Sequence, residues 1–205
     1  MKKTIGMVLL LLLIFIRLFG REEVKLKTPT FETNGNRLSV EVLGLAFQPY
    51  GNKIIIHKNG KEEVIQLKGK NKFNIYQMDL CNMDGEEGPE IIFGVNKKAP
   101  HHHVKTKRIF IYGYGKGFYP IYRCSRLYLP MEDFIVHCRE PQGEIIAIVK
   151  KDSQRILESF IYSNFGFHST GQFDMSSYKD FKIKDGNLWV KEKEWKEMDL
   201  KLLTR

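Results

Sequence analysis

A pattern of short apolar segments occurs twice in this chain, and this repeat restricts the fold more than any other feature. The run EIIFGV begins at Glu90 and the run EIIAIV begins at Glu144, and each is closely followed by a pair of lysines. The tripeptide FIY, followed by a Gly-Phe pair, occurs downstream of each run. Units of about 50 residues with several strands each are typical of propeller blades. We therefore expect repeats near residues 73–122 and 131–170.

The rest of the chain also carries strand patterns. Residues 38–42 alternate between apolar and polar side chains, which is the period of a strand with one buried face. Two turn signals, Asn59-Gly60 and Asp185-Gly186, each separate two short segments and predict β-hairpins. We expect an all-β fold of about three to four propeller-like antiparallel blades, as a small or incomplete propeller. Residues 38–42 should lie in its first sheet and residues 188–190 in its last.

The N-terminal segment is apolar behind two positive charges. Lys2 and Lys3 precede an apolar run over residues 5–16, and Arg17 follows the run. This order is typical either of a cleaved signal peptide or of an uncleaved signal-anchor helix. Lysines ahead of the run predict that the bulk of the chain is translocated.

These patterns divide the chain into three parts. We expect a hydrophobic signal or anchor helix over residues 1–20, a polar tether over residues 21–36, and a propeller-like β domain over residues 37–205. Residues 5–19 would contact the membrane. The protein is therefore expected outside the cytoplasm, either membrane-anchored or secreted.

The chain is basic, with a net charge of +9. A basic surface favours anionic partners, such as an anionic envelope polymer, or a protein partner. Lysines are scattered and mixed with glutamates, and the sequence shows no basic recognition helix, so no nucleic acid is expected. The three cysteines, Cys81, Cys124 and Cys138, cannot all pair within one chain. We expect buried free thiols, with one disulfide as the alternative.

The segment DLCNMDGEEGPEIIFGV at residues 79–95 resembles the FG-GAP (or VCBS-type) repeat of β-propeller proteins. That repeat has an acidic turn, D-x-D-x-D-G, followed by an acidic residue and an apolar strand. The resemblance covers about residues 73–170, and its second copy is eroded. It implies a propeller fold and a binding or scaffold role.

In the FG-GAP family, the acidic turn often binds calcium through carboxylate and carbonyl oxygens. Carried onto this chain, the candidate ligands are Asn82, Asp84 and Glu90. Leu80 stands where the family has its first aspartate, which puts the site in doubt. The turn is therefore either a plain polar turn or a calcium site, and no other cofactor is expected.

A second candidate site is the histidine- and lysine-rich segment after residue 100. In an extended segment His101 and His103 share one face, and imidazole suits zinc or copper. A second interpretation is an exposed loop that contacts an anion through its histidines and through Lys105, Lys107 or Arg108. The third is a solvent-exposed loop without a ligand.

The sequence shows no nucleophile elbow, no phosphate-binding glycine loop and no metalloprotease helix. We expect a non-catalytic extracytoplasmic binding or scaffold module of FG-GAP-like type. Two alternatives stay open: a cell-envelope hydrolase acting on glycans or anionic polymers, and a membrane-anchored assembly factor. The aromatic side chains should mostly pack between sheets, although some of them would suit a sugar- or peptide-binding surface.

Overall fold

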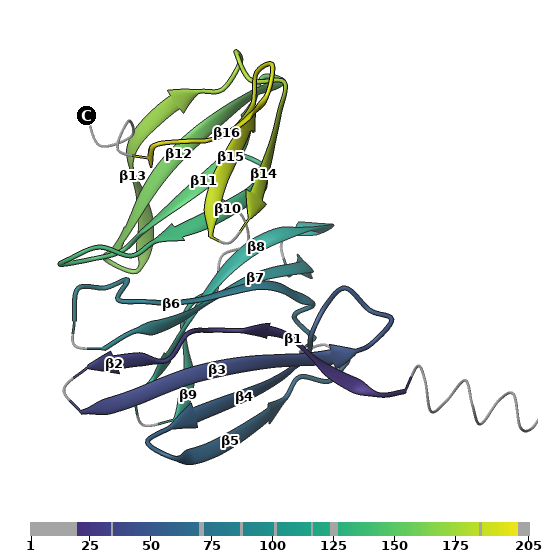
Figure 1. The fold of residues 1–205 in the computed structure, drawn as a ribbon, viewed down its shortest axis with the longest axis vertical. Helices are drawn as coiled ribbons and strands as arrows, with labels where there is room; N and C mark the ends of the chain where they lie inside the picture. Colours follow the sequence, from purple (N-terminus) through teal and green to yellow (C-terminus); the bar gives the residue numbers. More distant parts are fainter. Residues whose placement is uncertain are drawn as a thin grey trace, which may run out of the picture. The chain divides into compact units, whose positions relative to one another are not determined.

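The structure is a computed structural model that describes residues 20–33, 35–69, 72–86, 88–100, 102–115, 117–123, 127–184 and 186–200. These residues form sixteen strands in four sheets and contain no α-helix (Figure 1). Strands that are neighbours in a sheet are mostly consecutive in the chain, as in the meander of a propeller blade. The all-β, propeller-like expectation is therefore confirmed. The chain divides into two compact units, residues 1–78 and 79–205, where a single domain over 37–205 was expected.

The first sheet has the order β1-β3-β4-β5, and β2 also pairs with β3. One face of β3 and β4 is buried through alternate residues, including Val40, Val42 and Ile54, as the period-two pattern predicts. Asn59 and Gly60 both have positive φ angles (51° and 76°) and make the hairpin turn between β4 and β5. The strands are β1 (Glu22–Lys27), β2 (Phe31–Thr33), β3 (Asn36–Leu45), β4 (Lys53–Lys58) and β5 (Lys61–Gln66).

The expected tether over residues 21–36 is replaced by two strands. β1 pairs with β3 from Glu22 opposite Leu45 to Lys27 opposite Glu41, and β2 pairs with the start of β3. The segment looks polar because its strand positions carry charges: Lys25 and Lys27 form ion pairs with Glu23 and Glu41. A strand at the edge of a sheet tolerates such side chains, which also discourage pairing with other chains.

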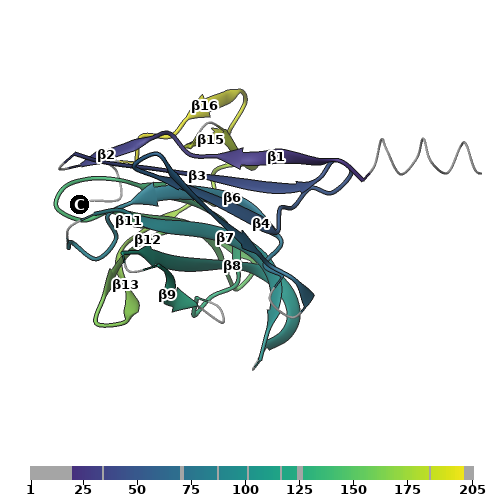
Figure 2. The same ribbon diagram turned by 90° about the horizontal axis from the view of Figure 1, so that it is seen from below.

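The second and third sheets are four-stranded meanders, with the orders β6-β7-β8-β9 and β10-β11-β12-β13 (Figures 1 and 2). Each stretch expected as a repeat thus coincides with one sheet. Glu90 begins β7 and Glu144 begins β11, the second strand of each meander, and both strands are buried on both faces over their apolar runs. The strands are β6 (Ile75–Cys81), β7 (Glu90–Ala99), β8 (His102–Tyr114), β9 (Phe118–Arg123), β10 (Met131–His137), β11 (Glu144–Lys151), β12 (Gln154–Ser163) and β13 (Gly166–Asp174).

The fourth sheet has three strands, β14 (Asp180–Lys184), β15 (Asn187–Lys191) and β16 (Trp195–Glu197), in the order β14-β15-β16. Its inner face, with Leu188 and Val190, packs on Ile146 and Leu157 of the third sheet in one apolar core. The placement of residues 38–42 and 188–190 in the first and last sheets is confirmed. Because side chains alternate along a strand, Trp189 faces away from this core.

The N-terminal hydrophobic helix expected over residues 1–20 lies outside the described residues, which begin at Gly20. The expected membrane contact of residues 5–19 also lies outside them. Within the described part of the chain, no helix has the length and apolar character needed to cross a membrane.

Candidate functional site

The acidic turn between β6 and β7 brings the three predicted metal ligands into one segment. The Asn82 side chain accepts a hydrogen bond from the Gly85 N–H (2.8 Å) and donates one to the Glu86 backbone oxygen (2.8 Å). Asp84 Oδ1 accepts the Glu86 N–H at 2.9 Å. Short polar side chains that bind nearby backbone groups stabilise such turns. Two of the three candidate ligands therefore already help to form the turn.

Glu90, the third candidate, is only 7% exposed. Its Oε2 accepts the backbone N–H of Met83 at 2.6 Å. Burial raises the pKa of Glu90 to about 7, and the nearby Asp84 charge adds to this, whereas the Met83 hydrogen bond opposes it. Burial also raises the pKa of the Tyr162 phenol, with contributions from Asp84 and Glu90. The carboxyl group of Glu90 therefore gains and loses its proton near neutral pH.

The calcium alternative for Asn82, Asp84 and Glu90 stays a prediction. In the part of the chain that the structure describes, no three His, Cys, Asp or Glu side chains gather as a metal-holding group. The turn offers the side-chain oxygens of Asn82, Asp84 and Glu90, and calcium takes roughly 6–8 oxygen ligands. Backbone oxygens and water would have to supply most of the others.

A disulfide links Cys81 to Cys138, which corrects the expectation of free thiols. Cys81 ends β6 and Cys138 directly follows β10, the first strands of the second and third sheets, and their Cα atoms are 5.5 Å apart, within the usual range for a disulfide. The two cysteines lie at similar places in the two repeats, a position that is equally compatible with small buried residues, so the sequence left this pairing open. Cys124 lies outside the described residues.

The turn after Cys138 packs against the acidic turn. The Gly143 N–H donates to the Asn82 backbone oxygen at 2.7 Å, and the Gln142 amide donates to the backbone oxygens of Met83 and Tyr162. A Cβ atom at Gly143 would collide with the Cys81 sulfur. The disulfide and these hydrogen bonds join the two turns.

Glu144 occupies the repeat position of Glu90 but has a different environment. It is 1% exposed and lies 3.0 Å from His137 Nδ1 and 3.0 Å from Arg139 Nη2. Ser159 Oγ donates to it at 2.7 Å. These three partners occupy both carboxylate oxygens, so Glu144 is the buried centre of a hydrogen-bonded network.

The structure separates the residues of the predicted anion-binding cluster. His101 lies outside the described residues. His103 and Lys105 are exposed on one face of β8. Arg108 lies an odd number of positions from both, so its side chain is on the opposite face of the strand. His103 and Lys105 thus share a face without Arg108.

Arg108 is 1% exposed and holds the β7–β8 hairpin together. Its guanidinium donates to the backbone oxygens of Lys97 (2.8 Å) and Val104 (3.3 Å). It also lies 3.0 Å from Nδ1 of His102. A rigid fork of donors suits this multiple contact. The described contacts of Arg108 are therefore with the hairpin itself.

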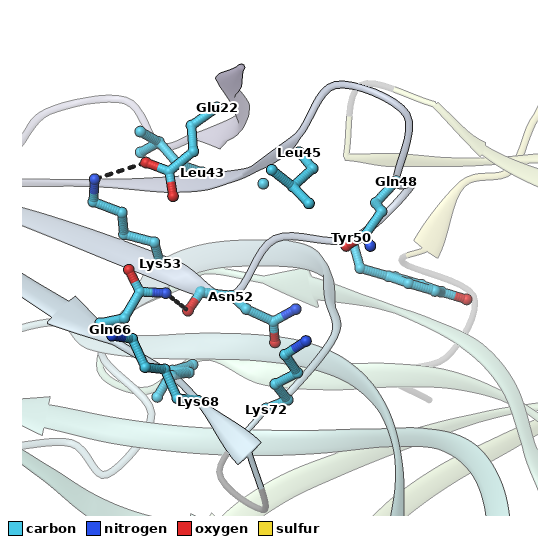
Figure 3. Close-up of a pocket in the computed structure, with 12 residues that line it drawn as sticks. Glu22, Leu43, Leu45, Gln48, Tyr50, Asn52, Lys53, Gln66, Lys68 and Lys72 are labelled. Carbon is cyan, nitrogen blue, oxygen red and sulfur yellow. Dashed lines mark hydrogen bonds and ion pairs between the residues drawn. The ribbon is translucent and has the colours of Figure 1, made fainter. Parts of the chain in front are cut away.

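An open hollow of about 210 Å³ lies in the first unit (Figure 3). Lys53 at one side is paired with Glu22 at 2.8 Å. The Oδ1 of Asn52, another lining residue, accepts the backbone N–H groups of Phe73 and Asn74, both at 2.9 Å. The polar groups of Lys53 and Asn52 thus connect neighbouring segments of this unit. The lining residues are Glu22, Leu43, Gly44, Leu45, Gln48, Tyr50, Asn52, Lys53, Gln66, Leu67, Lys68 and Lys72.

The outer face of the fourth sheet carries both tryptophans of the chain. Lys182 lies opposite Trp189 in the β14–β15 register, and Lys191 lies opposite Trp195 in the β15–β16 register. Lys182 Nζ is 4.2 Å from the ring centroid of Trp195 and 5.9 Å from that of Trp189. Lys191 Nζ is 5.8 Å from the Trp195 ring. We call these four residues the Trp–Lys face.

Four exposed polar residues surround the Trp–Lys face on the same side of the sheet: Asp180, Lys184, Asn187 and Glu197. Asp180 pairs with Lys191 in register, Glu197 pairs with Trp189, and Asn187 stands two positions before Trp189 on β15. Within the described residues, neither Lys182 nor Lys191 forms an ion pair with a carboxylate. The lysines contact indole rings instead, and a cation–π contact at an exposed site contributes little binding energy.

Sequence reasoning missed this face. The Asp185-Gly186 sequence predicts the hairpin. If these two residues form the turn, the flanking strands pair so that Lys182 lies opposite Trp189. Only the third strand, β16, brings Trp195 onto the same side.

Comparisons of the chain with protein-family models, with curated proteins and with solved structures give no match.

Proposed function

We propose that the protein is a non-catalytic, extracytoplasmic binding module that attaches to a component of the cell envelope through the Trp–Lys face. The observation that carries this proposal is the clustering of both tryptophans with two lysines on the outer face of the fourth sheet. Tryptophan is strongly enriched among the residues that dominate binding energy, because it offers a large, rigid contact area. An antiparallel sheet holds these rings in fixed positions.

The rest of the second unit supports a rigid scaffold. A disulfide and several hydrogen bonds join the second and third sheets, and an apolar core joins the third sheet to the fourth. Binding side chains on such elements need little ordering when a ligand arrives. The proposal includes the resemblance to FG-GAP repeats. It is supported by the equivalent places of Glu90 and Glu144 in two blade-like sheets.

Two features support a place outside the cytoplasm. The Cys81–Cys138 disulfide is of a kind that forms and persists in oxidising compartments. The apolar run behind Lys2 and Lys3 has the order of a translocation signal. Together they favour a protein exposed to envelope polymers.

The test uses the full-length chain in phosphatidylcholine nanodiscs, which accommodate an apolar N-terminal segment. Insoluble envelope polymer from the producing cells is mixed with the nanodiscs and sedimented, and the bound protein is measured in the pellet. We expect Trp189→Ala/Trp195→Ala to lower the affinity at least about fivefold.

The matched control is Phe165→Ala, which removes a 90% exposed ring from the turn after β12 and should leave the affinity unchanged. Thermal unfolding of each variant, followed by circular dichroism, verifies the fold. Sedimentation that is independent of both tryptophans would contradict the proposal.

A further inference from the structure

We infer that the ligand of the Trp–Lys face is an anionic polysaccharide, an inference that rests on the proposed function and names its ligand class. Three kinds of group meet on this face: two indole rings, two lysines that pair with no carboxylate among the described residues, and four surrounding polar side chains. Each kind matches one part of a charged sugar polymer.

The indole rings supply the stacking surface. Trp189 and Trp195 are half-buried and lie on neighbouring strands, β15 and β16. An indole ring is flat and apolar, which suits the flat apolar side of a pyranose ring. Lysine contacts with exposed rings are weak, so a sugar can displace them.

The lysines supply the charge recognition. Lys182 contacts both rings and Lys191 contacts one, so any ligand stacked on the tryptophans lies beside at least one ammonium group. Charge-assisted hydrogen bonds to a carboxylate or phosphate are stronger than bonds between neutral groups. An anionic substituent on the sugar would provide the missing partner.

The polar residues around the rings argue against other anionic ligands. Asp180 and Glu197 are exposed on the same face, and their charges would repel the dense phosphates of a lipid surface or a nucleic acid. The same carboxylates accept hydrogen bonds from sugar hydroxyls, and the Asn187 amide both donates and accepts. A polymer that alternates hydroxyl groups with spaced charges fits this arrangement best.

The experiment titrates the full-length chain, in phosphatidylcholine nanodiscs, with polygalacturonate, a polymer of uronic acid. Trp189 and Trp195 are the two tryptophans of the chain, so indole fluorescence reports directly on this face. We expect a shift in emission with polygalacturonate and an affinity at least about tenfold lower for its methyl-esterified form. Polyglutamate, which has carboxylates but no sugar rings, should give no shift.

Surface lysine variants test the charge recognition without disturbing the core. Lys182→Gln/Lys191→Gln should weaken polygalacturonate binding about tenfold and leave binding of the ester unchanged. The charge-matched control, Lys61→Gln/Lys151→Gln, replaces exposed lysines elsewhere and should bind both polymers like the wild type.

Several results would overturn the ligand class. These are equal affinity for the ester, an equal response to polyglutamate, no shift with polygalacturonate, or a shift that requires phosphatidylglycerol nanodiscs or oligothymidylate. If envelope sedimentation still depends on the tryptophans in these cases, the proposed function stands and only the ligand class is wrong. If sedimentation does not depend on them, the proposed function itself fails.

Discussion

Glu90 and Glu144 show how one repeat position acquires two electrostatic environments. Both begin the second strand of a meander and both are buried. Glu144 has Arg139, His137 and Ser159 as partners. The described contacts of Glu90 include a backbone N–H and no cation. Burial then dominates and favours the neutral form.

This difference predicts a pH-dependent stability that depends on Glu90. Its pKa rises from 4.5 to about 7 on folding, so between these values the folded protein holds more protons than the unfolded chain. The stability from the neutral carboxyl group is complete below about pH 4.5 and is lost as the pH rises through about 7. We expect Glu90→Gln to raise the free energy of unfolding at pH 8 by about 2 kcal/mol and to have little effect at pH 4.5.

Urea denaturation of the wild type and the variant at both pH values measures this difference. Glu86→Gln, in the exposed part of the same turn, is the control and should not change the pH profile. An increase in stability of the same size at both pH values would show that charge on Glu90 is not the cause.

At the scale of elements, the packing of the acidic turn between β6 and β7 against the turn after β10 depends on the lack of a side chain at Gly143. Its N–H reaches the Asn82 backbone oxygen at 2.7 Å. A Cβ atom at this position would meet the Cys81 sulfur, and it would lie 3.2 Å from the Asn82 oxygen and 3.2 Å from the Met83 sulfur. The turn after β10 therefore has no room for a larger residue.

We expect Gly143→Ala to lower the free energy of unfolding by about 2 kcal/mol, because the turns must separate to admit the methyl group. Gly166→Ala is the matched control, since a Cβ atom there meets no atom within 4 Å. Chemical denaturation of both variants measures the effect. Equal stability of the two would mean that the contact between the turns relaxes without cost.

The sequence predicted a strand correctly where a single local pattern, such as alternation or a turn signal, was sufficient. Alternation gave residues 38–42, and the positive-φ turn at Asn59-Gly60 gave the β4–β5 hairpin. The strand Glu22–Lys27 was not predicted, because its edge position allows charged side chains at most places. Local patterns describe a strand well when one of its faces is apolar and poorly otherwise.

The candidate sites were less predictable, because they depend on contacts between distant segments. The sequence placed Arg108 beside the histidines, but strand alternation puts it on the opposite face from His103 and Lys105. The Trp–Lys face needs the register of three strands, with Trp195 added by β16. Sequence spacing alone does not give that register.

At the scale of the whole molecule, the Cys81–Cys138 disulfide is the covalent link across the second unit. It joins residues that are 57 positions apart, at the ends of strands in two different sheets. A cross-link of this kind restricts the unfolded chain more than the folded one, and the stabilisation grows with the length of the closed loop. Its removal should therefore act on the stability of the unit and leave the strand register intact.

We expect the double variant Cys81→Ser/Cys138→Ser to unfold with a free energy about 4 kcal/mol lower than the wild type, as loop closure over 57 residues predicts. The double variant under reducing conditions is the control and should unfold as it does without the reducing agent. Urea denaturation with and without a reducing agent measures both effects, since reduction should destabilise the wild type and not the double variant. If reduction left the wild type unchanged, the two sheets would be joined by their hydrogen bonds and apolar contacts alone, and the disulfide would no longer support an oxidising location.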